Sequence, residues 1–248
     1  MAETSVTTTH LKNYDIISLK SVDSTSRFLK DYVSENRPNK PLFCTTKNQT
    51  AGYGQQKRSW LTNEKSAIFS LAFPVDKDYV LSGLVSLHIA SLLHQTLTEL
   101  TAETLYLKWP NDIFNDSGKV AGILIEQVIK KDYRAFIIGI GINRDASAEN
   151  PLLEGSSSVK HFDLEVFFQN FFKKIQQSEL QNYSQQKLAH YWQLNDLFRI
   201  DETVKLISPD IEEQGIYLGV NPQGQAVIKL PDTIKILSSG QTSIRKVL

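Results

Sequence analysis

Residues 108–112 combine side chains that can bind a charged ligand at the end of an expected strand. Lys108-Trp109-Pro110-Asn111-Asp112 follows the apolar run 104–107, and Lys119 opens the segment 119–126 soon afterwards. A lysine ammonium can neutralise charge on a phosphoryl or carboxylate oxygen, and an amide or carboxylate can orient a hydroxyl or a magnesium-bound water. A hydrophobic core needs none of these groups. Their position at the rim of two strands therefore indicates a site for a phosphorylated ligand, although a decorated turn is the plainer alternative.

A long polar loop offers a second set of ligand-binding groups. Residues 47–64 lack apolar periodicity and contain Gly52-Tyr53-Gly54, the cations Lys57-Arg58, and Trp60. Glycines let the backbone approach a ligand and expose its N–H groups, while the cations suit phosphates. We expect the loop to become ordered when ligand binds. A mobile surface loop is the alternative.

Two shorter patterns carry weaker signals. In Ile138-Gly139-Ile140-Gly141-Ile142-Asn143 the alternate glycines leave one strand face bare, so that a flat ligand or a closely packed element can lie against it. Asn143, at the strand end, could read a base edge. Ser24-Thr25 stands at an expected helix start, where capping is the simpler explanation of the hydroxyls.

Composition limits the class of protein. The 248 residues are 41% hydrophobic with a formal net charge of zero, which allows one sizeable core and gives no basic excess for nucleic acid. No segment reads as a signal peptide or membrane span, so we expect a cytoplasmic protein that binds neither DNA nor membrane. The single cysteine, Cys44, is expected to be buried and inert, and His88 to be a core histidine.

The elements that must position these residues follow from hydrophobic period and turn signals. Strands are expected at 16–19, 41–46, 66–73, 105–108, 120–128 and 135–142, with Pro74 ending the third. Helices are expected after Asp23 or Ser24, and at 80–100, 164–175 and 187–197. Short strands follow at 204–207, 215–220, 226–230, 234–237 and 243–247. The pattern predicts an α+β fold: a mixed, mostly antiparallel sheet backed by helices, then a small β-barrel.

Taken together and in this order, the segments resemble the biotin–protein ligases. The resemblance runs from about residue 17 to Asn143, with a weaker echo at 239–245. The matching segments are Ser24-Thr25, Gln49, Gly52-Tyr53-Gly54, Trp60, Lys108 to Asp112, Lys119 to Glu126, and Gly139 to Asn143. It implies the class II synthetase-like biotin/lipoate ligase fold, with a catalytic domain at 1–198 and a small SH3-like barrel at 199–248. It also implies the short form, without an N-terminal DNA-binding domain.

The resemblance implies ATP-dependent activation of biotin to biotinyl-5'-AMP with Mg²⁺, followed by transfer to a lysine of a carrier domain. Lys119 is then the main electrostatic catalyst. The implied biotin-binding residues are Ser24, Thr25, Gln49, Gly52, Tyr53, Gly54, Lys119, Gly122 and Leu124. The implied ATP-binding residues are Gln55, Arg58, Trp60, Lys108, Asn111, Asp112, Asn143 and Arg245. No direct metal ligand is assigned, and Asp112 could act on Mg²⁺ through water.

The glycine loop departs from the family pattern. Tyr53 and Gln55 stand where the pattern has arginines, Lys57 replaces a later glycine, and Gln241 replaces a usual acidic residue. We therefore expect biotinyl-AMP to escape more readily than from a relative with an arginine at position 55.

The implied enzyme is a biotin–[acetyl-CoA-carboxylase] ligase, and its implied partner is the biotin carboxyl carrier protein or domain of that or another biotin-dependent carboxylase. Family members often form homodimers. Two alternatives stay open: a lipoate or octanoate ligase or transferase with the same fold, and a non-catalytic relative that only binds biotin or a carrier. A plain structural α+β domain would leave the cations and amides unexplained.

Overall fold

A computed structural model describes residues 6–10, 12–60, 65–79, 82–146, 155–178, 184–208, 212–239 and 242–247. The chain divides into two compact units. The first unit consists of residues 1–81 and 117–161, and the second of residues 82–116 and 162–248. The expected domain boundary between residues 198 and 199 was placed where the composition of the sequence changes, and it stays a prediction.

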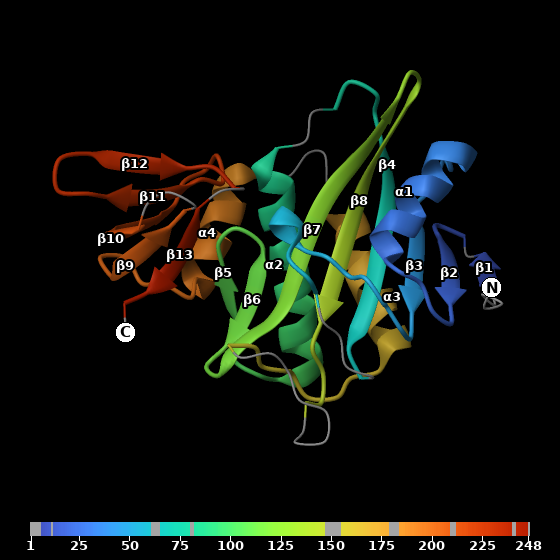
Figure 1. Ribbon diagram of the computed structural model, residues 1–248, viewed down its shortest axis with the longest axis horizontal. Coiled ribbons are helices and arrows are strands. Elements are labelled where there is room, and N and C mark those ends of the chain that lie inside the picture. Colours follow the sequence, from blue (N-terminus) through green and yellow to red (C-terminus); the bar gives the residue numbers. More distant parts are fainter. Residues whose placement is uncertain are drawn as a thin grey trace. The chain divides into compact units, whose positions relative to one another are not determined.

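The first unit is built on a mixed sheet (Figure 1). Its strands lie in the order β1-β2-β3-β4-β8-β7. Only β2 and β3 pair in parallel, and the other neighbours pair antiparallel. This confirms the expected mixed, mostly antiparallel sheet. The strands are β1 (Val6–His10), β2 (Asp15–Leu19), β3 (Leu42–Thr46), β4 (Ala67–Val75), β7 (Gly118–Lys130) and β8 (Tyr133–Ile142).

Helix α1 (Thr25–Asn36) makes the crossover between the two parallel strands and packs on β3, β4, β7 and β8. Ser24 caps its first turn, as expected: the Ser24 hydroxyl accepts from the backbone N–H of Arg27 at 3.3 Å. Leu29 and Val33, one helical turn apart, are fully buried against the sheet. Burial of each contributes about 1.5–3 kcal/mol, which fixes the face that α1 presents and hence the place of its N-terminus.

Three expectations about this chain's strands were wrong. Strand β4 continues through Pro74 to Val75 instead of ending before the proline. Its pairing with β3 stops at Ala72, so at Pro74 the strand pairs with β8 alone, and an edge position of this kind tolerates a residue without an N–H. Strand β1 was not expected, since all its residues are exposed and lack the alternating pattern. Strand β6 (Asp112–Asn115) was not expected either.

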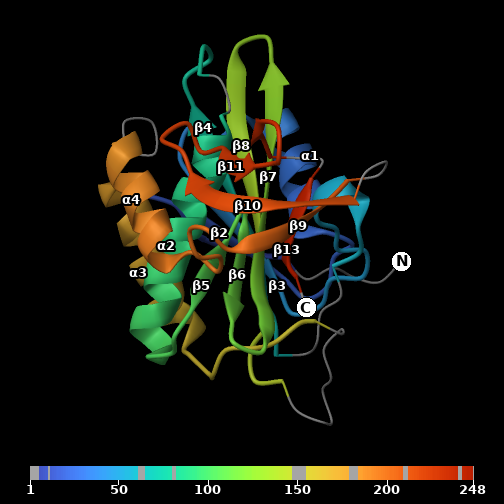
Figure 2. The ribbon, with the colours of Figure 1, turned by 90° about the vertical axis from the view of Figure 1, so that its left-hand side faces the viewer.

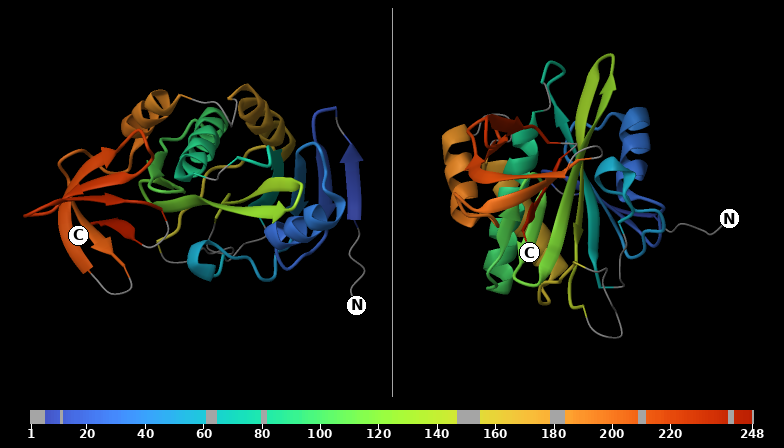
Figure 3. Two further views of the ribbon diagram at one scale, coloured as in Figure 1. Left: turned by 90° about the horizontal axis from the view of Figure 1, so that it is seen from above. Right: turned by 60° about the vertical axis from the view of Figure 1, so that its left-hand side comes forward.

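The second unit contains a hairpin, three helices and a separate sheet (Figures 2 and 3). Strands β5 (Tyr106–Lys108) and β6 pair antiparallel, and both contact α2 (Gly83–Thr101). Helix α2 also packs against α3 (Leu164–Gln177) and α4 (Gln185–Asn195). The helix was expected from Val80, but Val80 and Leu81 lie outside the described residues.

Helix α4 ends two residues earlier than expected. After Asn195 the backbone of Asp196 is extended, and the Asp196 carboxylate accepts from the N–H of Phe198 at 3.1 Å. The backbone N–H of Leu197 then donates to the carbonyl of Leu107 at 2.8 Å, so the chain leaves the helix to run beside β5.

All five expected short strands are present near the C-terminus and form an antiparallel sheet in the order β12-β11-β10-β9-β13. A turn at 221–224 separates two of these strands: Gly224 N–H donates to the carbonyl of Asn221 at 2.8 Å, and Gly224 lies in the left-handed region at φ 77°. The strands are β9 (Thr203–Ile207), β10 (Glu212–Val220), β11 (Ala226–Lys229), β12 (Ile234–Leu237) and β13 (Ser243–Lys246). Closure of this sheet into a barrel stays a prediction.

Candidate active site

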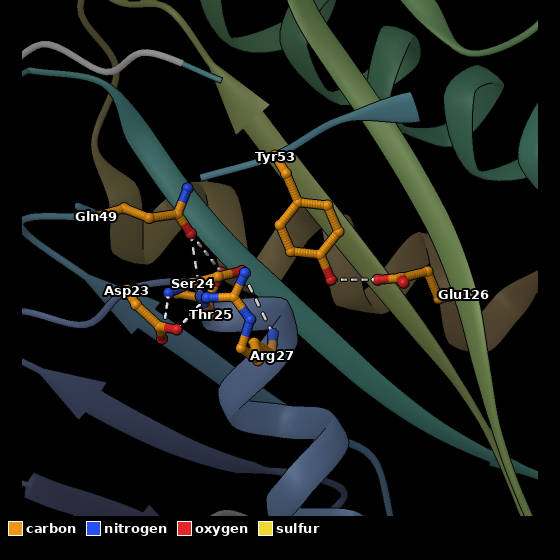
Figure 4. A network of polar contacts seen from close by, with 7 residues as sticks. All are labelled: Asp23, Ser24, Thr25, Arg27, Gln49, Tyr53 and Glu126. Atoms are coloured by element: carbon orange, nitrogen blue, oxygen red, sulfur yellow. Dashed lines mark hydrogen bonds and ion pairs between the residues drawn. The ribbon is translucent and has the colours of Figure 1, made fainter. Parts of the chain in front are cut away.

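A buried group of hydroxyls lies where α1 begins (Figure 4). The Thr25 hydroxyl is 2.7 Å from that of Ser70, which is 2.9 Å from that of Ser26. Gln49 joins the group, because its side-chain oxygen accepts from the backbone N–H of Thr25 at 3.0 Å. Ser24, Thr25 and Gln49 were expected to meet, and the first unit brings them together. We call Thr25, Ser26, Gln49 and Ser70 the polar floor.

Ser26 and Ser70 were missed by the sequence reasoning. Ser70 is the one polar side chain between Ala67 and Ala72 in β4, which is a usable signal, and it is fully buried. Gly139 on β8 makes room for the group, because a Cβ there would lie 2.5 Å from the Ser26 hydroxyl. The glycine face of β8 therefore accommodates a polar side chain at this point.

The glycine loop is tied to the segment before α1. The N–H groups of Thr50 and Ala51 donate to the carbonyls of Val22 and Asp23 at 3.0 and 2.8 Å. The loop then closes on itself through Trp60 N–H, which donates to the carbonyl of Gly52 at 3.0 Å. Gly52 has to be glycine here, since a Cβ would come within 2.3 Å of the Gln49 amide nitrogen. The loop thus starts beside the polar floor and returns to it.

Trp60 covers the expected bare strand face. A Cβ on Gly141 would lie 2.4 Å from the indole of Trp60, and one on Gly122 would lie 3.0 Å from the same ring. Gly122 and Gly141 are direct partners across β7 and β8. The Lys119 ammonium lies 5.3 Å from the centre of the Trp60 ring. The loop tryptophan, the glycine face and Lys119 therefore meet at one place in the first unit.

One donor at this place is unused. Within the part of the chain that the structure describes, the buried indole N–H of Trp60 has no hydrogen-bond partner. A buried donor left without an acceptor costs about 1–3 kcal/mol. An acceptor supplied by a ligand would remove that cost.

Hydrogen bonds hold Lys119 through its backbone and Asn143 through its side-chain amide. The N–H of Lys119 donates to the carbonyl of Gly155 at 3.1 Å, and its carbonyl accepts from Ser157 N–H at 2.8 Å. The amide nitrogen of Asn143 donates to the carbonyls of Lys119 and Ser157 at 3.3 and 3.1 Å. The amide of Asn143 thus fixes the start of β7, and its expected role at a base edge stays a prediction.

The second unit positions the motif at 108–112 by burying its aromatic ring. Trp109 is 1% exposed, and its indole N–H donates to the carbonyl of Gly224 at 3.0 Å. Lys108 and Asp112 are direct partners at the end of the β5–β6 hairpin, and the Lys108 ammonium lies 5.1 Å from the Phe114 ring centre. Asn111 is 7% exposed between them. The buried tryptophan explains why a turn contains so large a ring.

The remaining expected residues are placed as follows. Leu124 pairs with Gly139 across β7 and β8. Gln55 begins a single 3-10 turn, and the exposed Arg58 donates to the Gln56 side chain at 2.8 Å. Arg245 is exposed on the edge strand β13, whereas Gln241 lies outside the described residues.

Neither the thiol of Cys44 nor the imidazole of His88 is suited to act as a nucleophile or a base at neutral pH. Burial raises the pKa of the Cys44 thiol to about 12 and lowers the pKa of His88 to about 4. Cys44 and His88 both lie in the core, as expected. No three His, Cys, Asp or Glu side chains among the described residues gather to hold a metal ion.

The comparison with known families agrees with this geometry. The sequence profile of the Biotin/lipoate A/B protein ligase family matches residues 18–143, and the chain belongs to that family. The match contains the polar floor, the glycine loop, Trp60 and Lys119.

Similar proteins extend the likeness along the chain. The bifunctional ligase/repressor BirA of Salmonella typhimurium is 28% identical over 246 residues, which are 95% of this chain and 76% of that protein. The biotin–[acetyl-CoA-carboxylase] ligase of Paracoccus denitrificans is 25% identical over 209 residues, which are 79% of this chain and 87% of that protein. The biotin protein ligase from Aquifex aeolicus, solved in complex with biotin and ATP, superposes with a TM-score of 0.78 at 27% identity, covering 96% of this chain and 100% of that one. The expected ligase fold is confirmed.

Within the described residues, every helix is too short or too polar to traverse a lipid bilayer.

Proposed function

We propose that this chain is an ATP-dependent biotin protein ligase, which forms biotinyl-5'-AMP and transfers the biotinyl group to a lysine of a carrier domain. The observation that carries the proposal is the meeting of Lys119, Trp60 and the Gly122–Gly141 face in a chain of this family. That combination offers a flat apolar wall beside a cation, which suits an acyl group that ends in a carboxylate.

In the first step a biotin carboxylate oxygen attacks the α-phosphorus of ATP, and the bond from that phosphorus to the bridging oxygen breaks to release pyrophosphate. Negative charge increases on the α-phosphoryl oxygens as this happens. The Lys119 ammonium is the group proposed to neutralise that charge, and the stabilisation by such an ammonium is larger in a site that excludes water. Alignment and charge neutralisation are sufficient, and no protein nucleophile is required.

The biotin ring is assigned to the polar floor. Ser24, Thr25 and Gln49 are the residues proposed to bind its ureido group, with Gly52, Tyr53, Gly54, Gly122 and Leu124 lining the slot. Ser70 and Ser26 orient the Thr25 hydroxyl from below. The unused indole N–H of Trp60 is an additional donor toward the ligand.

The nucleotide is assigned to Gln55, Arg58, Trp60, Lys108, Asn111, Asp112, Asn143 and Arg245. Mg²⁺ commonly takes most of its ligands from substrate phosphates and water, with one or two carboxylates, and Asp112 fits that role. When bound, the ion supplies charge neutralisation at the phosphates. Lys108 and Arg58 supply the protein's own positive charge.

The second step is attack of a carrier lysine amine on the mixed anhydride, which releases AMP. The biotin carboxyl carrier protein of acetyl-CoA carboxylase, or a similar carrier domain, is the proposed partner, and the cytoplasm the proposed location. The likeness to the Paracoccus denitrificans ligase supports that choice. A homodimer is part of the same proposal, since relatives of this kind often associate.

The direct test is mass spectrometry of a biotin carboxyl carrier domain after incubation with the protein, ATP and biotin. We expect the carrier to gain one biotinyl group, and a carrier whose acceptor lysine is replaced by arginine to gain none. An unmodified carrier, with pyrophosphate released, would restrict the activity to the first step.

A lipoate or octanoate ligase is the competing enzyme. The buried hydroxyls and Gln49 favour the polar ureido ring over an apolar acyl chain, because an apolar ligand would cover them without using the hydrogen-bonding capacity that their contacts with one another leave over. Calorimetry with biotin and with lipoate, each in the presence of ATP, separates the two. Tighter binding of lipoate would contradict the assignment.

A non-catalytic relative is the competitor from another class. Pyrophosphate release on mixing the protein with biotin and ATP separates it from an enzyme. The presence of Lys119, Asn111 and Asp112 supports catalysis.

A further inference from the structure

Tyr53 replaces an arginine of the family pattern, and its side chain turns away from the polar floor toward β7 (Figure 4). Its hydroxyl donates to the Glu126 carboxylate at 2.6 Å. The other carboxylate oxygen of Glu126 accepts from the Lys30 ammonium at 2.9 Å. One carboxylate on β7 therefore connects the glycine loop to α1.

The ring of Tyr53 also contacts α1 directly. The Lys30 ammonium lies 5.3 Å from the ring centre and the Arg27 guanidinium 5.5 Å from it. These two cations are three residues apart and so share one helix face. Arg27 itself pairs with Asp23, the residue whose carbonyl accepts from the loop at Ala51. Cations at such distances attract an aromatic ring by about 0.5–1 kcal/mol or more each.

The contacts between Tyr53, Glu126 and Lys30 are partly shielded from water, so they can contribute to the stability of the loop. The side chains of Lys30 and Glu126 are 29% and 28% exposed. Burial, and then the hydrogen bond to Glu126, raise the pKa of the Tyr53 phenol above its ordinary value, so the hydroxyl keeps its proton at neutral pH. Burial lowers the pKa of Lys30, but its hydrogen bonds with Tyr53 and Glu126 outweigh that effect, so the pKa of Lys30 is raised overall. The donor and the ion pair thus persist together.

The rest of the loop is held by hydrogen bonds within its own backbone, such as the one from Gly54 N–H to the carbonyl of Arg58 at 2.8 Å. Residues 56–59 are exposed, and Gln56 and Lys57 both adopt left-handed backbone conformations, at φ 55° and 58°. Such conformations cost non-glycine residues about 1 kcal/mol or more each. A strained, exposed loop needs an anchor, and the side chain of Tyr53 lies between the two glycines that approach the site.

We propose that Tyr53 is a positioning residue: its hydroxyl, bound by Glu126, holds the glycine loop against β7 and α1, so that the Gly52–Gly54 backbone and Trp60 keep the place that the ligand requires. The inference rests on the proposed function for the identity of that ligand. Biotin stands as the ligand whose binding the anchor assists, and the chemical step itself does not involve the phenol.

The test compares Tyr53→Phe, Glu126→Ala and the double variant with the wild type. Trypsin can cleave after the exposed Lys57 and Arg58, and cleavage there, without ligand, reports on the loop alone. Loss of a hydrogen bond to a charged group typically changes an equilibrium constant about tenfold or more. We therefore expect trypsin to cleave the Tyr53→Phe variant about tenfold faster, and the KM for biotin to rise about tenfold. We expect kcat to fall less than twofold.

The double variant should be no worse than the more impaired single variant, because both changes break one contact. Tyr133→Phe is the matched control, since the buried Tyr133 hydroxyl has no hydrogen-bond partner among the described residues. Its loop cleavage and KM should equal those of the wild type.

Wild-type cleavage and KM in Tyr53→Phe would overturn the inference, as would additive effects in the double variant. A kcat loss with unchanged KM would also overturn it, since the phenol would then act in the chemical step. The proteolysis arm is independent of activity. If the wild type forms no biotinyl-AMP, the proposed function fails, and the cleavage rates still decide whether Tyr53 anchors the loop.

Discussion

The two units position their polar residues by different means. In the first unit, Thr25, Ser26 and Ser70 form a chain of hydroxyl contacts that continues to Gln49. In the second unit, the polar residues of the 108–112 turn flank Trp109, which is buried and bonded through its indole to Gly224. One group is ordered by its own hydrogen bonds, and the other by an apolar anchor.

The difference matches the ligands that we assign. An uncharged ureido ring is recognised by fixed dipoles, which must be preoriented because each is weak. Phosphates are recognised by charged side chains, whose positions can be less exact because their attraction acts over a longer distance. Changes in the polar floor should therefore weaken biotin binding as well as stability, and changes at Trp109 should alter stability first.

The largest expected effect comes from Trp109→Ala. Removal of a buried tryptophan typically costs about 3–5 kcal/mol of the free energy of unfolding. Trp109→Phe keeps most of the packing and loses the bond to Gly224, so it should cost about 1–2 kcal/mol. Urea denaturation measures both. Equal losses in the two variants would show that packing does not hold the turn.

A buried carboxylate in the second unit gives the next effect. Burial raises the pKa of Asp196 from 3.8 to about 7, although the Tyr217 hydroxyl donates to it at 2.6 Å. The folded protein thus binds this proton more tightly than the unfolded chain, and stability falls as pH rises from about 4 to about 7.

Asp196→Asn removes this dependence. The wild type should lose about 4 kcal/mol relative to the variant between pH 4 and pH 8, since each pKa unit is worth about 1.4 kcal/mol. His88, whose lowered pKa of about 4 gives the opposite slope below pH 6.5, is common to both proteins and cancels in the difference. Denaturation curves across this range check it, and a constant difference would contradict it.

Much of the fold was predictable because the elements are locally marked. Ser24 marks the start of α1. The short apolar segments separated by turns after residue 203 predict the second sheet. Strand β1 was not predictable, because its five exposed residues carry no pattern and only its pairing with β2 defines it. The prediction at Pro74 was wrong for a related reason: whether a strand can contain a proline depends on where the neighbouring strand ends.

The site was predictable where a motif is contiguous, as at Lys119 and in the glycine loop. Ser70 and Glu126 are different, because the partners of each lie 44 or more residues away in sequence. Only the folded chain brings them together. The cover that Trp60 places over Gly141 was likewise outside the reach of the sequence.

Ser70→Ala tests the polar floor. It removes a partner from both Thr25 and Ser26, which should cost about 1–3 kcal/mol of stability and weaken biotin binding about tenfold. ATP binding should change less than twofold. Calorimetry with each ligand decides, and equal weakening of both would contradict the separation between the two regions. Ser91→Ala, in α2, is a matched buried-serine control.

The smallest expected effect is that of Lys57→Gly. Lys57 has a left-handed backbone at φ 58°, where glycine is not penalised, so the variant should relieve about 1 kcal/mol of local strain. Slower trypsin cleavage after Arg58 would indicate a better-held loop. Faster cleavage would mean that flexibility gained by the glycine outweighs the relief.

The central claim is that Lys119 stabilises the charge of the adenylation step. Single-turnover formation of biotinyl-AMP, measured without a carrier, tests it directly. Lys119→Ala should lower that rate at least about a hundredfold while the thermal unfolding midpoint stays near that of the wild type. Lys131→Ala, in the exposed β7–β8 turn, should form the adenylate at the wild-type rate. A Lys119→Ala variant that forms biotinyl-AMP at the wild-type rate would contradict the account.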